Sequence, residues 1–364
     1  MKAFRFIGSR VEAPTEASAV PAVVRAQREP ITAVVVSADG QYAYAASKDG
    51  TVAKFYVPAG TRVATYGKSE RRTGRGQAHT ARVLALALTT DGRVLAAGGE
   101  DHAIHLWDTE RDARIDTLSG HRDAVTALAF RANTRQLFSA GRDRTVKVWN
   151  ADSLAYVEAL FGHQAEVLAL ASLDRERVVS AGADSTCRVW KIVEQSQLVF
   201  HGHRSAIEAL ALLNDNIWVA GGQDGAVSLW LASKRAPVDF RARAHGGRWI
   251  TAVAACPRTD LIATGSSDGF VRLWSLARAA PAGASGASGN ARSQGASGLP
   301  KLQLQKAIPI AGFVNGLAFS ASGELLVVGV GKEHRLGRWE TISAARNGVV
   351  FVPLSFRKDD AADD

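Results

Sequence analysis

Residues 120–150, GHRDAVTALAFRANTRQLFSAGRDRTVKVWN, contain one complete copy of the pattern that decides the fold. Three runs of alternating apolar and polar residues lie within this stretch: Val125–Phe130, Gln136–Ser139 and Val146–Trp149. Side chains of a β-strand point alternately to its two faces, so each run predicts a short strand with one buried face. A unit of three such strands is too small to bury its own faces, and the fold therefore needs further copies of it.

The chain contains seven such copies, each marked by an aromatic residue where the third strand ends. These residues are Phe55, Trp107, Trp149, Trp190, Trp230, Trp274 and Trp339. Four of the gaps between them are 40 to 44 residues, the period of one four-stranded propeller blade, and gaps of 52 and 65 residues fit the same period with an insertion. We therefore predict an all-β fold, a seven-bladed β-propeller.

A second pattern joins polar residues within the copies. An acidic residue stands six positions before each aromatic, a hydroxyl stands ten positions before it in three copies, and a histidine opens five copies. A hydrogen-bonded chain from Asp through His and hydroxyl to the indole N–H gives each buried polar group a partner, and an unpaired one costs about 1–3 kcal/mol. We expect three complete networks, with a structural and not a catalytic role: His121, Ser139, Asp143 and Trp149; His163, Ser180, Asp184 and Trp190; His245, Thr264, Asp268 and Trp274. Ala97 and Ala220 replace the hydroxyl in units two and five, so those networks should lack a member or use water.

These spacings resemble those of the WD-repeat family, and the resemblance covers residues 31–354. We expect a preceding segment at 1–30, a disordered Gly/Ala/Ser insertion at 276–300 and an acidic tail at 355–364. A ring must also cover its last open edge. Two segments are candidates for this outer, ring-closing strand, Ala22–Arg25 and Gly348–Leu354, and the sequence does not choose between them.

The composition narrows the class of partner. The chain has 44 Lys+Arg against 35 Asp+Glu, a net charge of +9 and a pI near 9.8, which favours a polyanion. No apolar run approaches the roughly 18–20 residues of a membrane span, so no membrane partner is expected. Cys187 and Cys256 are expected to be buried thiols in a reducing compartment. His102 and His105 are expected at the surface, and no metal site is predicted.

The most basic segments should meet on one face. Lys68, Arg71, Arg72 and Arg75 precede the first strand of unit two, and Lys332, His334 and Arg335 lie in the turn of unit seven. Unit seven neighbours unit one in a closed ring, so these two groups should lie side by side, with Arg122, Arg142 and Arg144 of unit three further round. Few aromatic residues are interleaved, which favours folded RNA held by its backbone and shape over base stacking.

Several segments support a narrower resemblance: 120–130, 142–150, YVEALFGHQAEVLAL (156–170), SQLVFHGH (196–203), GVGKEHRLGRW (329–339) and AARN (344–347). They are similar to the WD-repeat core proteins of the U3 small nucleolar ribonucleoprotein. The resemblance implies a nucleolar, non-enzymatic scaffold that binds U3 snoRNA at its box B/C region beside the small kink-turn-binding protein. It also implies a place in the small-subunit processome, with pre-rRNA as an indirect partner and no cofactor or small-molecule substrate. The implied contact region includes Lys332, Glu333, His334 and Arg335.

Two other classes of function remain open from the sequence. One is a protein-only adaptor, such as a substrate receptor of a ubiquitin ligase. Such receptors often carry Arg two residues after a Trp-Asp pair, whereas Trp107-Asp108 is followed by Thr109 and Glu110. The other is an enzyme on a propeller scaffold, which would need acid–base pairs or metal ligands outside the repeat pattern.

Overall fold

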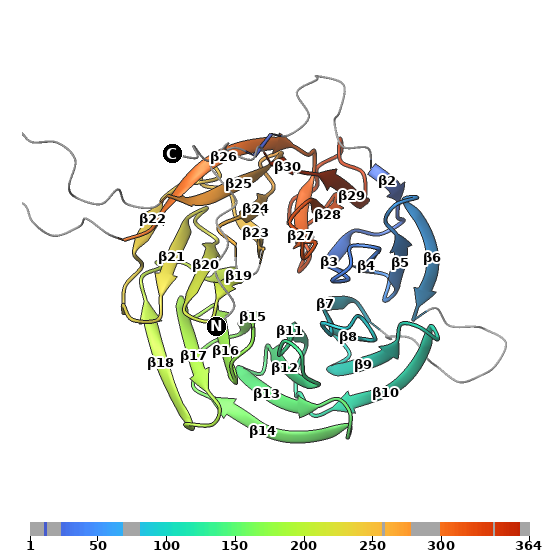
Figure 1. The fold of residues 1–364 in the computed structure, drawn as a ribbon, viewed down its shortest axis with the longest axis horizontal. Coiled ribbons are helices and arrows are strands. Elements are labelled where there is room, and N and C mark those ends of the chain that lie inside the picture. The colour runs from blue at the N-terminus through green and yellow to red at the C-terminus, as the bar shows by residue number, and fades with distance from the viewer. Residues whose placement is uncertain are drawn as a thin grey trace, which may run out of the picture.

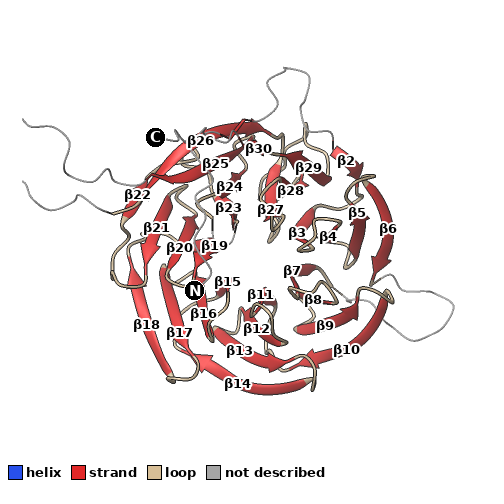
Figure 2. Ribbon diagram, viewed as in Figure 1, coloured by secondary structure: helices blue, strands red, loops and turns tan. Residues whose placement is uncertain are grey.

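The computed structural model describes residues 11–12, 23–67, 81–256, 259–277, 299–337 and 339–356. Seven four-stranded antiparallel sheets stand around a central channel, which confirms the seven-bladed propeller (Figure 1). Figure 2 shows that strands and loops make up the described ranges. No helix in these ranges has the length and apolar character that crossing a membrane requires.

Blades one to six each use four consecutive strands, the first lying at the channel and the fourth at the rim (Figure 1). Blade one comprises β3 (Ile31–Val36), β4 (Tyr42–Ser47), β5 (Val52–Tyr56) and β6 (Thr61–Tyr66). Blade two comprises β7 (Val83–Leu88), β8 (Val94–Gly99), β9 (Ala103–Asp108) and β10 (Ala113–Ser119). Blade three comprises β11 (Val125–Phe130), β12 (Gln136–Gly141), β13 (Thr145–Asn150) and β14 (Ala155–Phe161).

The next three blades follow the same order. Blade four comprises β15 (Val167–Ala171), β16 (Arg177–Gly182), β17 (Thr186–Lys191) and β18 (Ser196–His201). Blade five comprises β19 (Ile207–Asn214), β20 (Ile217–Gly222), β21 (Val227–Leu231) and β22 (Asp239–Arg241). Blade six comprises β23 (Ile250–Ala255), β24 (Ile262–Ser266), β25 (Phe270–Ala277) and β26 (Lys301–Pro309).

Blade seven is assembled from both ends of the chain. Its first three strands are β27 (Phe313–Phe319), β28 (Leu325–Gly331) and β29 (Gly348–Pro353), and its outer strand is the N-terminal β2 (Val23–Ala26). β2 pairs with β29 and closes the ring, so the N-terminal candidate for the closing strand is the right one. The other candidate, residues 348–354, is wrong as an outer strand because it supplies the third strand.

Two predicted boundaries need correction. Ser355–Phe356, expected in the acidic tail, form β30, which pairs with β1 (Val11–Glu12). Leu276 and Ala277, expected in the Gly/Ala/Ser insertion, complete β25 opposite Leu302 and Lys301, because the buried Leu276 side chain extends the core there. The rest of that insertion, 278–298, lies outside the described residues, as do 357–364 of the tail.

Trp339 is not the repeat aromatic of unit seven. Register places Phe351 opposite Val327 in blade seven, as Trp149 stands opposite Leu137 in blade three. Trp339 instead lies in the connection between β28 and β29 and is 65% exposed. The prediction was wrong because the insertion falls inside the turn before the third strand, and residue counting cannot separate a displaced aromatic from an added one.

The core lies between neighbouring blades, where apolar side chains of adjacent sheets form seven clusters. Cys187 and Cys256 are buried free thiols. Two glycines on second strands show how tightly the blades approach. A Cβ on Gly98 or Gly265 would stand under 3 Å from a valine of the following blade.

Three blades contain the hydrogen bonds that the spacing predicts. In blade three, His121 Nδ1 lies 2.8 Å from Asp143 Oδ2, His121 Nε2 lies 2.7 Å from Ser139 Oγ, and the Trp149 indole donates to Ser139 Oγ at 2.8 Å. Burial alone would raise the pKa of Asp143, but the hydrogen bond from His121 holds it well below its usual range. The same connections join His163, Ser180, Asp184 and Trp190 in blade four, and His245, Thr264, Asp268 and Trp274 in blade six.

Blades two and five, which have alanine at the hydroxyl position, take a polar group from the neighbouring strand. Ser228 stands opposite Ala220, lies 2.5 Å from His203 Nε2 and accepts from the Trp230 indole. In blade two, His105 stands opposite Ala97 and bonds to Asp101, at 3.2 Å. The prediction that His105 lies at the surface was therefore wrong: it is buried.

Candidate nucleic-acid interface and central channel

The connection between β28 and β29, residues 332–347, is here called the blade-seven loop. It folds back on itself through a bridge between Glu333 and Thr341 and through a hydrogen bond from the Ile342 amide to the Lys332 carbonyl. Asn347 accepts from the Lys332 amide at 2.7 Å and ties the two ends of the loop together. The loop is therefore a compact structure on the face that carries the turns between second and third strands.

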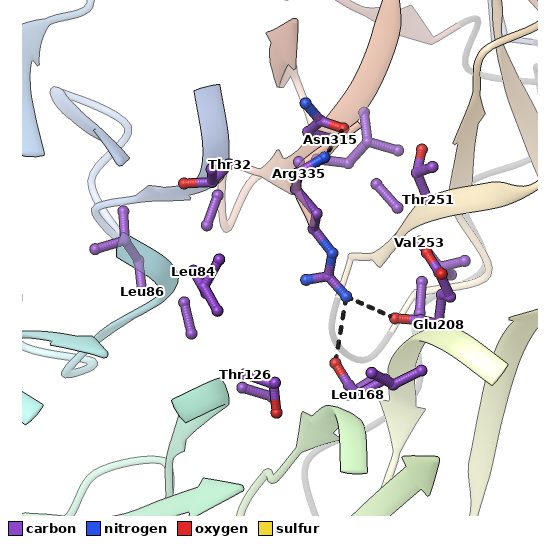
Figure 3. Close-up of a pocket in the computed structure, with 18 of the residues that line it drawn as sticks. Thr32, Leu84, Leu86, Thr126, Leu168, Glu208, Thr251, Val253, Asn315 and Arg335 are labelled. Atoms are coloured by element: carbon purple, nitrogen blue, oxygen red, sulfur yellow. Dashed lines mark hydrogen bonds between the residues drawn. The ribbon is translucent and has the colours of Figure 1, made fainter. Parts of the chain in front are cut away.

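Arg335 extends from this loop into the central channel. Its guanidinium Nη2 donates to the backbone carbonyls of Leu168 at 3.3 Å and Glu208 at 3.1 Å, on the first strands of blades four and five (Figure 3). The Arg335 amide donates to Asn315 Oδ1, and Asn315 Nδ2 donates to the Ile31 carbonyl of blade one. Arg335 thus connects blades seven, four and five across a cavity of about 140 Å³, and Asn315 extends these contacts to blade one.

His334 and Glu208 form a buried hydrogen-bonded pair beside Arg335. His334 Nε2 lies 3.1 Å from Glu208 Oε2, and Gln223 donates to Glu208 Oε1 at 2.9 Å. Burial alone would raise the pKa of Glu208, but the hydrogen bond from His334 and the positive charge of Arg335 hold it below its usual value. Burial lowers the pKa of Arg335, and the Glu208 carboxylate opposes that effect.

The structure changes the predicted basic patch at this loop. Lys332 is exposed, whereas His334 and Arg335 are buried, so the expectation of three surface cations here was wrong. Their burial has a physical cause, since Glu208 and the open carbonyls of the first strands offer partners that solvent would otherwise supply. The other half of the predicted patch, Lys68, Arg71, Arg72 and Arg75, lies outside the described residues.

A second group of cations surrounds the turn of blade three. Arg122 and Arg144 are exposed, while Arg142 is half-buried with its Nε 3.6 Å from Glu166. Arg144 has φ of +66°, in the left-handed region, where the equivalent residues of blades one, five and six are Gly50, Gly225 and Gly269. A side chain there costs about 1 kcal/mol, so blade three holds a cation at a position that favours glycine.

The blade-seven loop contributes to an aromatic cluster that the sequence analysis missed. The rings of Trp249, just before β23, and Trp339 stand 5.7 Å apart between centroids, and each lies within 5.6 Å of the His334 ring. With Phe313 they line a pocket of about 190 Å³, closed on one side by Arg248 and Glu340. A tryptophan outside the repeat pattern would have indicated a binding pocket in the sequence. Trp339 is such a residue, but the sequence analysis counted it as the repeat aromatic of unit seven.

The described residues contain no group of three or more His, Cys, Asp or Glu side chains placed to hold a metal ion. The His–Asp–hydroxyl sets recur in three blades and end on a tryptophan, as a structural network does. What this face offers is cations, aromatic rings and hydrogen-bonding groups on a rigid frame, which is the chemistry of a binding surface.

A seven-bladed ring with these recurring networks defines a WD-repeat protein. The model of the family "WD domain, G-beta repeat" matches residues 21–53, 71–108, 113–150, 155–191, 194–230 and 240–275, and thus leaves out β27, β28 and β29 of blade seven. The human "U3 small nucleolar RNA-interacting protein 2" is 42% identical over 361 residues, which are 96% of this chain and 72% of that protein. The Arabidopsis thaliana "U3 snoRNP-associated protein-like YAO" is 32% identical over 386 residues, with 96% and 72% covered.

Solved structures agree with these relatives. The one described as "Crystal structure of RRP9 WD40 repeats" is 42% identical, has a TM-score of 0.85 and covers 95% of this chain and 100% of its own. "Structure of U3-55K" is 42% identical, has a TM-score of 0.83 and covers 92% and 99%. The chain belongs to this family of U3 snoRNP WD-repeat proteins.

Proposed function

We propose that this chain is a non-catalytic scaffold that binds U3 snoRNA within the U3 small nucleolar ribonucleoprotein. It contacts the box B/C region beside the small kink-turn-binding protein. In the nucleolus it supports pre-rRNA processing for the small ribosomal subunit, together with other processome proteins. The names of its relatives and the chain's net charge of +9 support this proposal.

The observation that carries the proposal is the face that bears the turns between second and third strands. Lys332, Arg122 and Arg144 are exposed there, and Arg144 occupies a backbone position that favours glycine. Exposed cations on a rigid frame replace the cations condensed on phosphates, and each such contact adds about 0.7–0.9 to the slope of log K against log salt. The buried Arg335 and His334 fix the loop that presents Lys332, which is a positioning role.

Charge reversal at Lys332 tests the proposal. Fluorescence anisotropy with a labelled U3 box B/C fragment, carrying its kink-turn-binding protein, measures affinity between about 50 and 200 mM salt. We expect Lys332→Glu to weaken binding and to reduce the salt slope by at least about 0.7.

The matched control is Lys301→Glu. Lys301 is exposed at the start of the outer strand β26, at the opposite end of the blades from the turns between second and third strands. Lys301→Glu changes the net charge by the same amount as Lys332→Glu and should leave the slope of log K against log salt nearly unchanged. Equal slopes for the two variants would remove Lys332 from the interface, and a wild-type chain that does not bind the fragment would refute the function.

A further inference from the structure

The aromatic pocket beside the blade-seven loop has a feature that scaffolding does not explain. The chain has eight tryptophans, and six of them are buried. The two exposed ones, Trp249 at 39% and Trp339 at 65%, are ninety residues apart in sequence and yet lie in contact. Large exposed aromatic surface is costly in water, and two such rings together mark a binding site more often than a packing defect.

The pocket is also built in advance. The His334 ring lines it, with its Nε2 held 3.1 Å from Glu208 Oε2, and Phe313 packs against the same ring at 6.1 Å between centroids. Arg248 of blade six donates to both carboxylate oxygens of Glu340 at 2.9 Å and so pins the loop beside Trp249. Because these side chains are already held in place, a ligand that enters the pocket does not have to order them, and this favours affinity.

We propose that this pocket takes one unstacked nucleobase of the bound RNA. The inference rests on the proposed function and extends it, because backbone contacts alone would not need aromatic rings. Proteins that bind unpaired RNA stack splayed bases on aromatic rings and pair the base edges with polar side chains. Here Trp249 and Trp339 offer the ring faces, while Arg248 offers N–H donors and Glu340 offers acceptors at the rim.

The composition of the pocket favours a base over a cationic side chain. An aromatic cage for an ammonium or guanidinium group gains from a free carboxylate, whereas Glu340 is engaged by Arg248. The guanidinium of Arg248 lines the same pocket and would repel a second cation. A neutral, flat group with both donors and acceptors on its edge meets no such penalty.

A double-mutant cycle between protein and RNA tests the inference. Each unpaired nucleotide of the U3 box B/C fragment is replaced in turn by an abasic one, and affinity is measured for the wild-type chain and for Trp339→Ala. We expect one abasic position to weaken wild-type binding about 5- to 150-fold, the weight of one stacked base. The same position should have almost no effect on Trp339→Ala, because the two changes remove one contact.

Two control variants separate stacking from other effects. Trp339→Phe keeps a ring and should retain most of the affinity, with the salt slope unchanged. Phe161→Ala removes a side chain that is 70% exposed on the rim strand β14 and should change nothing.

The outcomes keep this inference apart from the function it rests on. Wild-type binding with every abasic position additive to Trp339→Ala overturns the base pocket and leaves the scaffold intact. Unchanged RNA binding by Trp339→Ala, with loss of a protein from the purified particle, assigns the pocket to that protein and equally overturns the inference. A wild-type chain that binds no RNA overturns both.

Discussion

Replacing Glu208 by glutamine should show how far the propeller depends on the charge in its channel. Glu208 is 1% exposed, and its carboxylate bonds to His334 and Gln223 while its carbonyl accepts from Arg335. Glutamine has the same shape and keeps an acceptor for His334, and a flipped Gln223 amide can accept from the new N–H, so the main change is the loss of the negative charge. It leaves the guanidinium of Arg335, a residue that is 9% exposed, without the carboxylate that opposes the effect of burial on its pKa.

Removing one partner of a buried charge pair costs about 3–5 kcal/mol, and Arg335 keeps its two carbonyl acceptors, so we expect a loss near the lower limit, about 3 kcal/mol, in unfolding free energy. Urea denaturation followed by tryptophan fluorescence measures it, after reversibility has been checked. Arg335→Met in the Glu208→Gln background removes the stranded charge and should recover part of the loss. The coupling energy of the pair should therefore exceed about 1 kcal/mol.

Glu110→Gln is the matched control, since Glu110 pairs with Arg93 on the open surface. An exposed pair contributes about 0–1 kcal/mol, and the control should stay within that range. The reasoning fails if Glu208→Gln costs no more than Glu110→Gln. It fails as well if the Glu208 and Arg335 changes add to within about 0.5 kcal/mol, because the two groups would then act independently.

Two further predictions concern the backbone of the turns and the response to acid. Arg144→Gly should raise the unfolding free energy by up to about 1 kcal/mol by relieving the left-handed backbone, yet weaken RNA binding in the anisotropy assay. Ser185→Gly, at the equivalent position of blade four with φ of +61°, should stabilise likewise and leave the RNA salt slope unchanged; equal slopes for both variants would contradict a role for Arg144. The second prediction concerns acid. Asp143 and Asp184 have folded-state pKa values below the usual range, so their stabilisation is present above about pH 4 and is lost as the pH falls toward those values. Urea denaturation should show the unfolding free energy declining between about pH 5 and pH 2, and a flat profile would contradict it.

The repeat could be predicted from sequence because its signals are local. Strand alternation and the spacing of Asp143, Ser139 and Trp149 reflect contacts within one blade, and these residues bond as the spacing requires. Even the ring-closing strand was among two candidates, since a strand pattern before the first unit has few other uses.

Contacts between blades could not be predicted in the same way. The pattern of Lys332, His334 and Arg335 predicts a solvent-exposed turn. Nothing in the local sequence indicates that Glu208, more than 120 residues away, lies inside the ring and bonds to His334. Ser228 likewise supplies, from the neighbouring strand, the hydroxyl that Ala220 lacks, and residue spacing along one strand cannot show this. In both cases a partner distant in sequence supplies the hydrogen bond that decides the position.

The blade-seven loop is held by contacts to several blades, and these contacts explain how it presents a binding surface. Lys48 of blade one donates to Glu333 and to the Gly337 carbonyl, Arg335 reaches blades four and five, and Arg248 of blade six holds Glu340. A loop tied to this many blades cannot shift without disturbing the ring, so these contacts hold Trp339 in its exposed position. His334 and Arg335, which the sequence analysis expected to contact RNA, instead form hydrogen bonds inside the channel. These bonds fix the position of Lys332 and of the aromatic pocket. Weakening the buried anchor should therefore reduce RNA binding even though Arg335 and Glu208 do not face the RNA.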